Sequence, residues 1–435
     1  MIDIRALREN FEETVGLLSR RGLDTTLIKD LYDLDAHLRS AVAERDQLRG
    51  EVNELSRQVG EAFKAGDREV GEELRIRSKR LGERLDLLTS EAAELEAQRR
   101  ELWLVIPNLP DPEATIGLTE EENVVRRYWT PSQGESSSLP VLSFPEYTRK
   151  PHWEIGKELD ILDLERGAKL SGSMFPMYKG LGSRMLRALT SFALDQHSDA
   201  FLEIHPPTFV KTETMISTGH LPKFGEEAYH IEKDDLWAIP TAEVPLTSMA
   251  RDEIIDGVEL PIRMTASTPC FRREAGSAGR DTRGLLRLHE FDKVELMVYA
   301  KPEQVQDVFS DMLSRAEGIL RSLGLTYRVL DLCTGDIGQS SRRTFDLEVY
   351  SPGVDRWLEA SSVSWCGDYQ ARRANIRYRD EISGEIHSVH TLNGSALAWA
   401  RIFAVLIEVN RQEDGSVLIP KVLQPYMGGA QNIQR

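Results

Sequence analysis

Cysteine is scarce in this sequence, with Cys270, Cys333 and Cys366 as the three cysteines among 435 residues. Three scattered cysteines cannot form a disulfide framework, and no Cys-x-x-Cys or His-x-x-x-His spacing indicates a structural zinc. We therefore expect a protein of the reducing cytoplasm without a structural zinc site.

Long apolar runs are also missing. The most apolar stretch, residues 394–409, is shorter than the ~20 residues that a membrane-spanning helix needs, and Arg401 interrupts it. The N-terminus is charged from Asp3 onward and has no apolar signal core. We therefore expect a soluble, non-secreted protein without a membrane partner.

Positive charge is in deficit, because 54 Lys and Arg face 71 Asp and Glu, for a net charge of −17. This balance disfavours generic coating of nucleic acid but leaves room for a specific nucleic-acid partner at a local basic patch. The chain also lacks a Gly-x-x-x-x-Gly-Lys-Ser/Thr motif and a Gly-x-Gly-x-x-Gly motif after a strand. P-loop and dinucleotide-binding folds are therefore disfavoured.

The first hundred residues contain a long periodic pattern. Apolar residues recur at a mean spacing of ~3.5 from Leu27 to Ala62 and again from Leu74 to Leu102, as in a coiled-coil seam. A glycine-containing break at 61–68 separates the two runs. The pattern predicts an antiparallel helical hairpin at about 27–104, within an N-terminal domain of residues 1–104. Such a rod can serve dimerisation or spacing, or it can grip an extended partner.

One positive cluster lies just past the break. A solvated face explains such a cluster, and so does a face that contacts phosphates. Its members are Arg75, Arg77, Lys79, Arg80 and Arg84.

The rest of the chain divides into a linker and a second domain. Pro107, Pro110 and Pro112 end the helical pattern, so residues 105–150 are predicted to be an extended linker. Residues 151–435 mix predicted helices (181–195, 302–323, 395–411) with predicted strands (236–239, 289–299, 345–350, 356–360). No strict βαβ alternation appears, which favours an α+β domain on a mostly antiparallel sheet with flanking helices.

Residues 268–298 show the clearest chemical signal. Two strand-like flanks enclose a loop rich in glycine and arginine, with Arg272 and Arg273 at its base. Glycine lets the backbone approach a ligand, and arginine offers paired donors to phosphate. The loop suits a nucleoside triphosphate, although an ordinary long hairpin is also compatible. Its other glycines and arginines are Gly276, Gly279, Gly284, Arg280, Arg283 and Arg287.

Three carboxylates have apolar neighbours: Glu243, Glu295 and Glu359. Strand alternation places Glu295 on one face with Met297 and Tyr299, opposite Val294, Leu296 and Val298. An ionised carboxylate in such surroundings needs a partner. A buried arginine, a cationic substrate group and a metal-bound nucleotide all satisfy that need.

Several segments resemble known proteins. Phe271-Arg272-Arg273-Glu274 resembles the Phe-Arg-x-Glu of motif 2 in class II aminoacyl-tRNA synthetases. The continuation at 275–295 resembles the bacterial seryl-tRNA synthetases, as do residues 218–224, 240–246 and 391–395, and the hairpin resembles that family's tRNA-binding arm. The resemblance implies a homodimeric enzyme that activates L-serine with ATP and Mg²⁺. It also implies transfer of serine to tRNA(Ser), and to tRNA(Sec) where that tRNA is present.

The resemblance also implies roles for individual residues. Arg272 and Arg401 are catalytic, holding the α-phosphate and the γ-phosphate, and Pro207 lies at the dimer interface. Thr241 and Glu243 hold the serine ammonium, Glu274 reads the adenine, and Glu359 and Ser362 bind Mg²⁺. The serine-binding set is Thr241, Glu243, Arg272, Glu295 and Ser395. The ATP-binding set is Arg272, Arg273, Glu274, Leu288, Glu359, Ala360, Ser361, Ser362 and Arg401. The tRNA-binding set is Arg75, Arg77, Lys79, Arg80 and Arg84.

The sequence departs from the family pattern near motif 3, where Trp399 and Ala400 are unusual beside Arg401. These departures leave a specialised copy open, for example one serving antibiotic biosynthesis or self-resistance. A catalytically silent paralogue that binds tRNA or regulates is a further alternative, and so is a ligase that loads a carrier protein. The retained arginines and carboxylates oppose the silent paralogue, and the full arm opposes the carrier-protein ligase.

Overall fold

The computed structural model describes residues 1–275 and 283–435, so the predictions at Gly276, Gly279 and Arg280 lie outside it. The chain forms two compact units. The smaller unit comprises Ile4–Ser19 and Leu23–Ile106. The larger unit comprises Met1–Asp3, Arg20–Gly22 and Pro107–Arg435. No helix within the described ranges is both long enough and apolar enough to cross a membrane.

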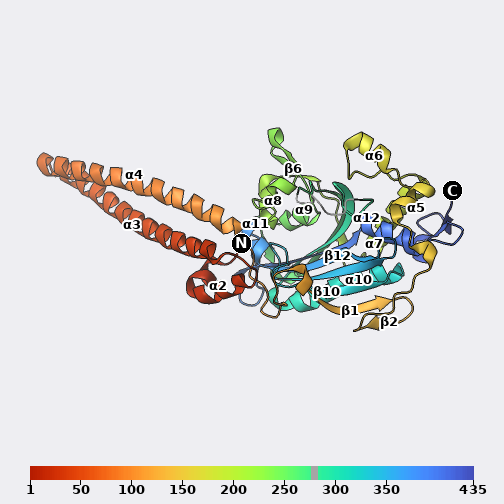
Figure 1. The fold of residues 1–435 in the computed structure, drawn as a ribbon. Coiled ribbons are helices and arrows are strands. Elements are labelled where there is room, and N and C mark those ends of the chain that lie inside the picture. The colour runs from red at the N-terminus through yellow and green to blue at the C-terminus, as the bar shows by residue number, and fades with distance from the viewer. Residues whose placement is uncertain (276–282) are drawn as a thin grey trace. The chain divides into compact units, whose positions relative to one another are not determined.

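A pair of long helices dominates the smaller unit (Figure 1). α3 (Thr25–Lys64) and α4 (Arg68–Val105) run antiparallel, and the side chains of Asp24 and Asp67 cap their first turns. The two helices contact each other along their length, and their buried apolar side chains are Ile28, Leu31, Leu38, Ala41, Leu55, Leu88, Ala92 and Leu104. This arrangement confirms the predicted hairpin, with Ile28 buried in place of the predicted Leu27. Two short helices, α1 (Ile4–Glu9) and α2 (Phe11–Ser19), precede the pair.

A buried carboxylate interrupts the apolar seam. Asp35 is 1% exposed, and it forms ion pairs with Arg8 at 2.7 Å, Arg99 at 3.0 Å and Arg39 at 3.2 Å. Burial alone would raise the pKa of Asp35, but hydrogen bonds from Arg8 and Arg99 bring it below its usual value. This stabilisation is therefore present at neutral pH and is lost as the pH falls through that lowered pKa.

Replacing Asp35 with asparagine is expected to destabilise the smaller unit by about 2 kcal/mol, because three guanidinium groups lose their shared anion. Thermal denaturation followed by circular dichroism measures this as a lower melting midpoint. Glu54→Gln, which removes an exposed pair with Arg57, is the matched control and is expected to change stability by less than about 0.5 kcal/mol. Equal midpoints for the two variants would contradict the role assigned to Asp35.

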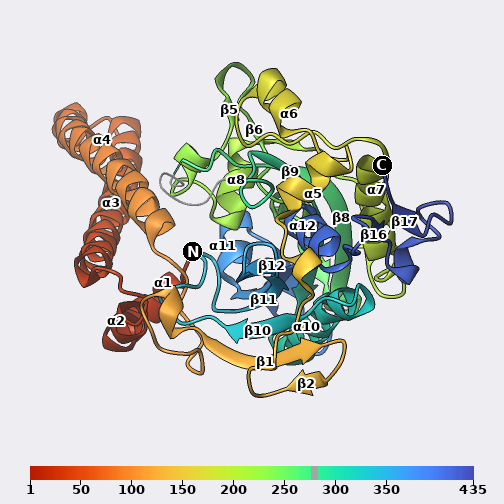
Figure 2. The same ribbon diagram turned by 45° about the vertical axis from the view of Figure 1, so that its right-hand side comes forward.

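The larger unit is built on a nine-stranded sheet (Figure 2). Neighbouring strands pair antiparallel except at the β3–β8 edge, which is parallel. The mostly antiparallel sheet predicted from the sequence is therefore confirmed. In spatial order the strands are β2 (Gly134–Ser136), β1 (Val124–Thr130), β10 (Tyr327–Asp331), β11 (Arg343–Ser351), β12 (Arg356–Gly367), β15 (His390–Ala398), β9 (Glu290–Ala300), β8 (Ile262–Phe271) and β3 (Leu202–Glu203).

Smaller sheets and helices surround this sheet. One three-stranded sheet has the order β14 (Ile386–Ser388), β13 (Arg377–Arg379) and β7 (Ile254–Asp256). A second has the order β4 (Phe209–Lys211), β6 (Leu236–Ala238) and β5 (His230–Ile231). A two-stranded sheet joins β16 (Val417–Leu418) and β17 (Asn432–Ile433). The α-helices are α5 (His152–Glu158), α6 (Leu164–Ser171), α7 (Gly180–Asp195), α8 (Thr212–Thr218), α9 (Glu243–Ser248), α10 (Val305–Ser322), α11 (Tyr369–Ala374) and α12 (Trp399–Val409). Short 3₁₀ helices lie at Glu120–Glu122, Glu146–Thr148, Gly225–Glu227, Glu232–Asp234, Gly257–Glu259, Pro302–Gln304 and Lys421–Leu423.

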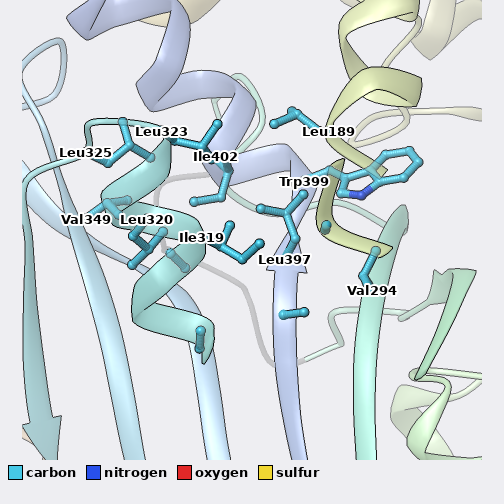
Figure 3. Packing of buried hydrophobic residues seen from close by; sticks show 14 of the residues in the cluster. Leu189, Val294, Ile319, Leu320, Leu323, Leu325, Val349, Leu397, Trp399 and Ile402 are labelled. Atoms are coloured by element: carbon cyan, nitrogen blue, oxygen red, sulfur yellow. The ribbon is translucent and has the colours of Figure 1, made fainter. Parts of the chain in front are cut away.

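The main core lies between one face of the large sheet and three helices, α7, α10 and α12. Figure 3 shows Leu189 of α7, Ile319 of α10 and Ile402 of α12 among the buried side chains that pack with Leu397 of β15. Trp399, one of the unusual residues near motif 3, packs into this core and is 9% exposed. Its bulk is therefore accommodated inside the fold.

Strand β9 separates this core from the opposite face of the sheet. Val294, Leu296 and Val298 belong to the main core, whereas Met297 and Tyr299 pack in a second cluster with residues of α9 and α11. The predicted alternation along this strand is therefore confirmed, and Glu295 faces away from the main core.

Two local predictions differ from the structure. The predicted helix at 395–411 begins only at Trp399, because residues 390–398 form β15, which pairs with β9 and β12. Within the predicted linker at 105–150, Val124–Thr130 forms β1, which pairs with β10. In both segments, pairing with a distant strand determines a conformation that the local pattern leaves open.

Candidate active site

A cleft of about 300 Å³ opens beside the face of the sheet that carries Glu295. Its lining comes from residues 218–224, the start of α9, residues 272–274 after β8, residues 285–288 before β9, the strands β9, β12 and β15, the start of α12 and a loop at 338–341. These segments are far apart in the sequence, and the large sheet brings them together. The cleft therefore collects side chains that no single segment could supply.

A buried charged cluster forms one part of the lining. Lys293 forms an ion pair with Glu295 and donates a hydrogen bond to Thr241 Oγ1 at 2.8 Å. The Thr241 hydroxyl donates in turn to Glu295 Oε2 at 3.0 Å. Glu295 is 1% exposed, and Lys293 meets the need for a cationic partner. Thr241 and Glu295 are thus held rigidly beside the cleft.

Glu243 lines the cleft together with the Thr241, Lys293 and Glu295 cluster. Its carboxylate accepts hydrogen bonds from Gln370 Nε2 at 2.6 Å and Asn393 Nδ2 at 3.1 Å. Burial, with the Glu295 carboxylate as the next contribution, raises the pKa of Glu243 to about 7. Both hydrogen-bond partners are neutral, so a cationic ligand group in the cleft would pair with this carboxylate.

The motif 2 residues form the arginine-rich side of the cleft. The Arg272 guanidinium lies over the Phe291 ring, 5.2 Å from its centroid. Glu274, whose backbone has a φ of 51°, forms an ion pair of 2.9 Å with Arg287. Arg272, Glu274, Arg287 and Phe291 all line the cleft, so cationic and aromatic groups meet there.

A buried histidine holds the chain that follows this arginine-rich segment. The backbone N–H of Leu285 donates to His152 Nε2 at 2.9 Å, and His152 Nδ1 contacts Glu408 Oε1 at 2.9 Å. Because Nε2 accepts a hydrogen bond, the ring proton of His152 is on Nδ1, and this N–H group donates a hydrogen bond to Glu408 Oε1. A Cβ atom at Gly284 would lie 2.3 Å from His152 Nε2, so only glycine allows this close approach.

Glu359 and Arg401 form the remaining charged part of the cleft. Arg401 Nη1 lies 3.3 Å from Glu359 Oε2 and donates to the Glu359 backbone carbonyl at 2.9 Å. The Glu359 side chain is half exposed; its partial desolvation alone would raise its pKa, but Arg401 and Arg272 bring that pKa below its usual value. On the adjacent strand, burial and the Glu359 carboxylate raise the pKa of Asp346 well above its usual value.

The structure brings most of the predicted site residues into this cleft. Those that line it are Thr241, Glu243, Arg272, Glu274, Leu288, Glu295, Glu359, Ser362, Ser395 and Arg401. Arg273, Ala360 and Ser361 lie outside the lining, although Ser361 Oγ donates to the Ser395 carbonyl at 2.5 Å. In the smaller unit, the basic cluster is exposed, and two of its members form ion pairs there: Arg75 with Glu72 and Arg84 with Glu44.

Sequence reasoning assigned no role to several polar residues of the site, among them the partners of Glu243 and Glu295: Lys293, Gln370 and Asn393. Lys293 had a usable signal, because it lies two residues before Glu295 and therefore on the same face of a strand. Gln370 had none, and Asn393 lies in the family-like segment 391–395 without a signal for its partner, because their contacts with Glu243 join segments more than a hundred residues apart.

Two family descriptions match the chain. Residues 227–410 match the tRNA synthetase class II core domain (G, H, P, S and T), and residues 1–110 match the seryl-tRNA synthetase N-terminal domain. Together with the antiparallel sheet and its cleft, the first match defines the larger unit as the core of a class II aminoacyl-tRNA synthetase.

Full-length relatives narrow the assignment. The serine–tRNA ligase of Syntrophotalea carbinolica is 44% identical over 100% of both chains, and that of Geobacillus kaustophilus is 47% identical over 98% of this chain and 99% of its own. The structure of seryl-tRNA synthetase from Pyrococcus horikoshii complexed with ATP is 34% identical, with a TM-score of 0.90, over 100% of this chain and 99% of that one. The chain belongs to the seryl-tRNA synthetase family.

Proposed function

We propose that this chain activates L-serine with ATP to seryl-adenylate and then esterifies the 3′ end of tRNA(Ser), and of tRNA(Sec) where that tRNA occurs. The observation that carries the proposal is one cleft lined by the carboxylates of Glu243 and Glu295 and by the guanidinium groups of Arg272 and Arg401. Carboxylates suit an amino-acid ammonium, and arginines suit a triphosphate. Family membership supports the same pair of substrates.

Amino-acid-dependent ATP–pyrophosphate exchange tests the activation step. The assay uses serine, threonine, alanine and glycine in turn, without tRNA. We expect exchange with serine alone. Folded protein that exchanges with none of the four would overturn the proposal and favour a silent paralogue.

Arginine chemistry accounts for the activation step. The serine carboxylate attacks the α-phosphate, and negative charge concentrates in the transition state as pyrophosphate departs. Arg272 would hold the α-phosphate and the attacking carboxylate together, while Arg401 would bind the γ-phosphate. Glu274 and the backbone at Leu288 would hold the adenine, and Arg273, Ala360 and Ser361 are proposed as further nucleotide contacts.

The oxygen groups on β12 fit a magnesium ion bound together with ATP. Glu359 and Ser362 both line the cleft, and the Glu359 side chain is half exposed. On the neighbouring strand, Asp346 Oδ1 has no hydrogen-bond partner within the described ranges. Mg²⁺ prefers such hard oxygen ligands and fills its other positions with water and phosphate. Glu359 and Ser362 would hold the ion, which supplies neutralisation of phosphate charge when bound.

Selectivity would follow from the buried cluster at Thr241 and Glu295. Glu295 and Ser395 would hydrogen-bond the serine hydroxyl, while Thr241 and Glu243 hold the ammonium. A site built to bond a hydroxyl rejects alanine and glycine, because its polar groups would stay unpaired. Threonine carries the hydroxyl as well, so its extra methyl group must be excluded by lack of space.

The raised pKa of Glu243 predicts a pH-dependent affinity for serine. Since that pKa is about 7, the ionised form that pairs with an ammonium declines as the pH falls from 8 to 6. We expect the KM for serine to rise about tenfold over this range, measured by pyrophosphate exchange at saturating ATP. Glu243→Gln should bind serine weakly at every pH and lose this dependence. A serine KM that is equal at pH 6 and pH 8 would contradict the role of Glu243.

The remaining assignments concern partners and domains. We propose that residues 1–104 bind the tRNA, through phosphates and shape at the basic cluster of Arg75–Arg84, and that residues 151–435 catalyse both steps. We further propose a homodimer with Pro207 at its interface and, from the scarcity of cysteine, a cytoplasmic location. The resemblance to the seryl-tRNA synthetase family supports both tRNA binding by the helical arm and the formation of a homodimer.

A further inference from the structure

The loop at residues 337–341, which contributes to the cleft, is held through its carbonyl groups. Each of five consecutive carbonyls accepts a hydrogen bond from either Arg21 or Asn108. Arg21 Nη2 donates to Ile337 O and Gly338 O at 2.8 Å, and Arg21 Nη1 donates to Ser341 O at 3.3 Å. Asn108 donates to Gln339 O from its backbone N–H at 2.9 Å and to Ser340 O from Nδ2 at 2.8 Å.

The two donor residues also hold each other. Arg21 Nη1 donates to the Asn108 carbonyl at 2.8 Å, so one guanidinium joins Asn108 to both ends of the loop. Its planar fork allows several carbonyls to be bonded in fixed directions, which the single ammonium of lysine cannot reproduce. Burial lowers the pKa of Arg21 to about 10, so the side chain keeps its charge at neutral pH.

The loop that they hold borders the part of the cleft near Glu243. Gly338, Gln339, Ser340 and Ser341 all line the cleft. The Cys366 thiol lies 3.7 Å from Ser340 Oγ and 3.6 Å from Asn393 Nδ2, and Asn393 donates to Glu243. Asn108 Nδ2 also donates to the Cys366 carbonyl at 2.7 Å. A short series of contacts therefore runs from Asn108 to Glu243.

We propose that Arg21 and Asn108 are positioning residues for the serine end of the cleft. Both lie within residues 1–110, the range matched by the N-terminal domain description, yet both belong to the larger compact unit. Neither lines the cleft, so they act through the loop at 337–341. The proposal rests on the proposed function, because it takes Glu243 as the group that holds the serine ammonium.

The test uses the full chain with Arg21→Gln, Arg21→Lys and Asn108→Ala. Pyrophosphate exchange gives separate KM values for serine and ATP, and kcat. We expect Arg21→Gln and Asn108→Ala to raise the serine KM at least about tenfold, because a displaced loop shifts the groups around Glu243. The ATP KM should stay within about twofold, since Arg272 and Arg401 are held by other segments. Arg21→Lys should fall between Arg21→Gln and the unaltered protein.

Arg20→Gln is the matched control. It changes the adjacent arginine, whose backbone carbonyl accepts from Thr334 and survives the substitution, so its serine KM should not change. An unchanged serine KM in Asn108→Ala and Arg21→Gln would overturn the proposal, and so would equal increases in the KM values for serine and ATP. If Arg21→Gln does not fold, Asn108→Ala and Arg21→Lys are judged by the same two quantities, the serine KM and the ATP KM. The unaltered protein is the reference: its failure to exchange with serine would overturn the proposed function itself.

Discussion

Replacing Arg272 with alanine is expected to reduce serine-dependent pyrophosphate exchange at least about a thousandfold, the scale of effect that a phosphate-stabilising arginine has in other phosphoryl-transfer enzymes. The guanidinium lines the cleft beside the Phe291 ring, and within the described ranges no carboxylate forms an ion pair with it. It is therefore available to bind an anion. Its backbone N–H, which bonds the His289 carbonyl at 2.9 Å, remains in the variant.

The measurement compares initial exchange rates with thermal midpoints. We expect Arg272→Ala to keep the midpoint of the unaltered protein, because an exposed side chain is removed. Arg272→Lys should recover only part of the rate, because lysine keeps the charge but loses the paired donors. Arg166→Ala, at an exposed ion pair on α6, is the surface control and should stay fully active. An active, folded Arg272→Ala would refute the assigned role.

Shortening the helical pair is expected to separate the two steps of the proposed reaction. Ala41 of α3 and Ala92 of α4 are both buried in the seam, so removing residues 42–91 and joining these positions by a short turn keeps the base of the pair. The ion pairs of Asp35 with Arg8 and Arg99 stay in place. The deletion removes the whole basic cluster of Arg75–Arg84.

We expect this variant to retain pyrophosphate exchange with serine and to lose charging of tRNA(Ser) by a factor of about a thousand, the scale on which phosphate contacts contribute to affinity. Aminoacylation with radioactive serine measures the loss. A second variant that replaces only the five basic residues with glutamine separates the effect of charge from that of the rod itself. Normal charging by the shortened chain would refute the proposed role of the arm.

The helical pair of the smaller unit could be predicted from the sequence because its apolar contacts come from two neighbouring segments with a regular spacing. A spacing of ~3.5 residues identifies the seam whatever surrounds it, and the predicted hairpin at 27–104 matches α3 and α4 closely. The exception is Asp35, whose burial in the seam the pattern of apolar residues does not predict. Its burial depends on Arg8 and Arg99, which are 27 and 64 residues away along the chain.

The larger unit was predictable only where a pattern is long. Alternation over β9 placed Glu295 correctly, whereas the short run Ala396-Leu397-Ala398 fits a helix or a strand equally well. The segment forms a strand because it pairs with β9, and no local sequence signal predicts this pairing. The roles given to the cleft residues came from motifs of the family, since spacing alone identified a need for partners but not which partners.

The connection between the two compact units has a consequence for engineering and for evolution. Along the chain, Leu23–Ile106 is an insertion between two segments, Arg20–Gly22 and Pro107 onward, that both belong to the larger unit. A chimera that exchanged the first hundred residues as a module would remove Arg21 from its carbonyl partners, whereas one that exchanged only the helical insertion would leave them intact. The fold of the larger unit therefore sets no requirement on the length of the helical insertion, whereas the short segments on either side are expected to change together with the loop that they hold.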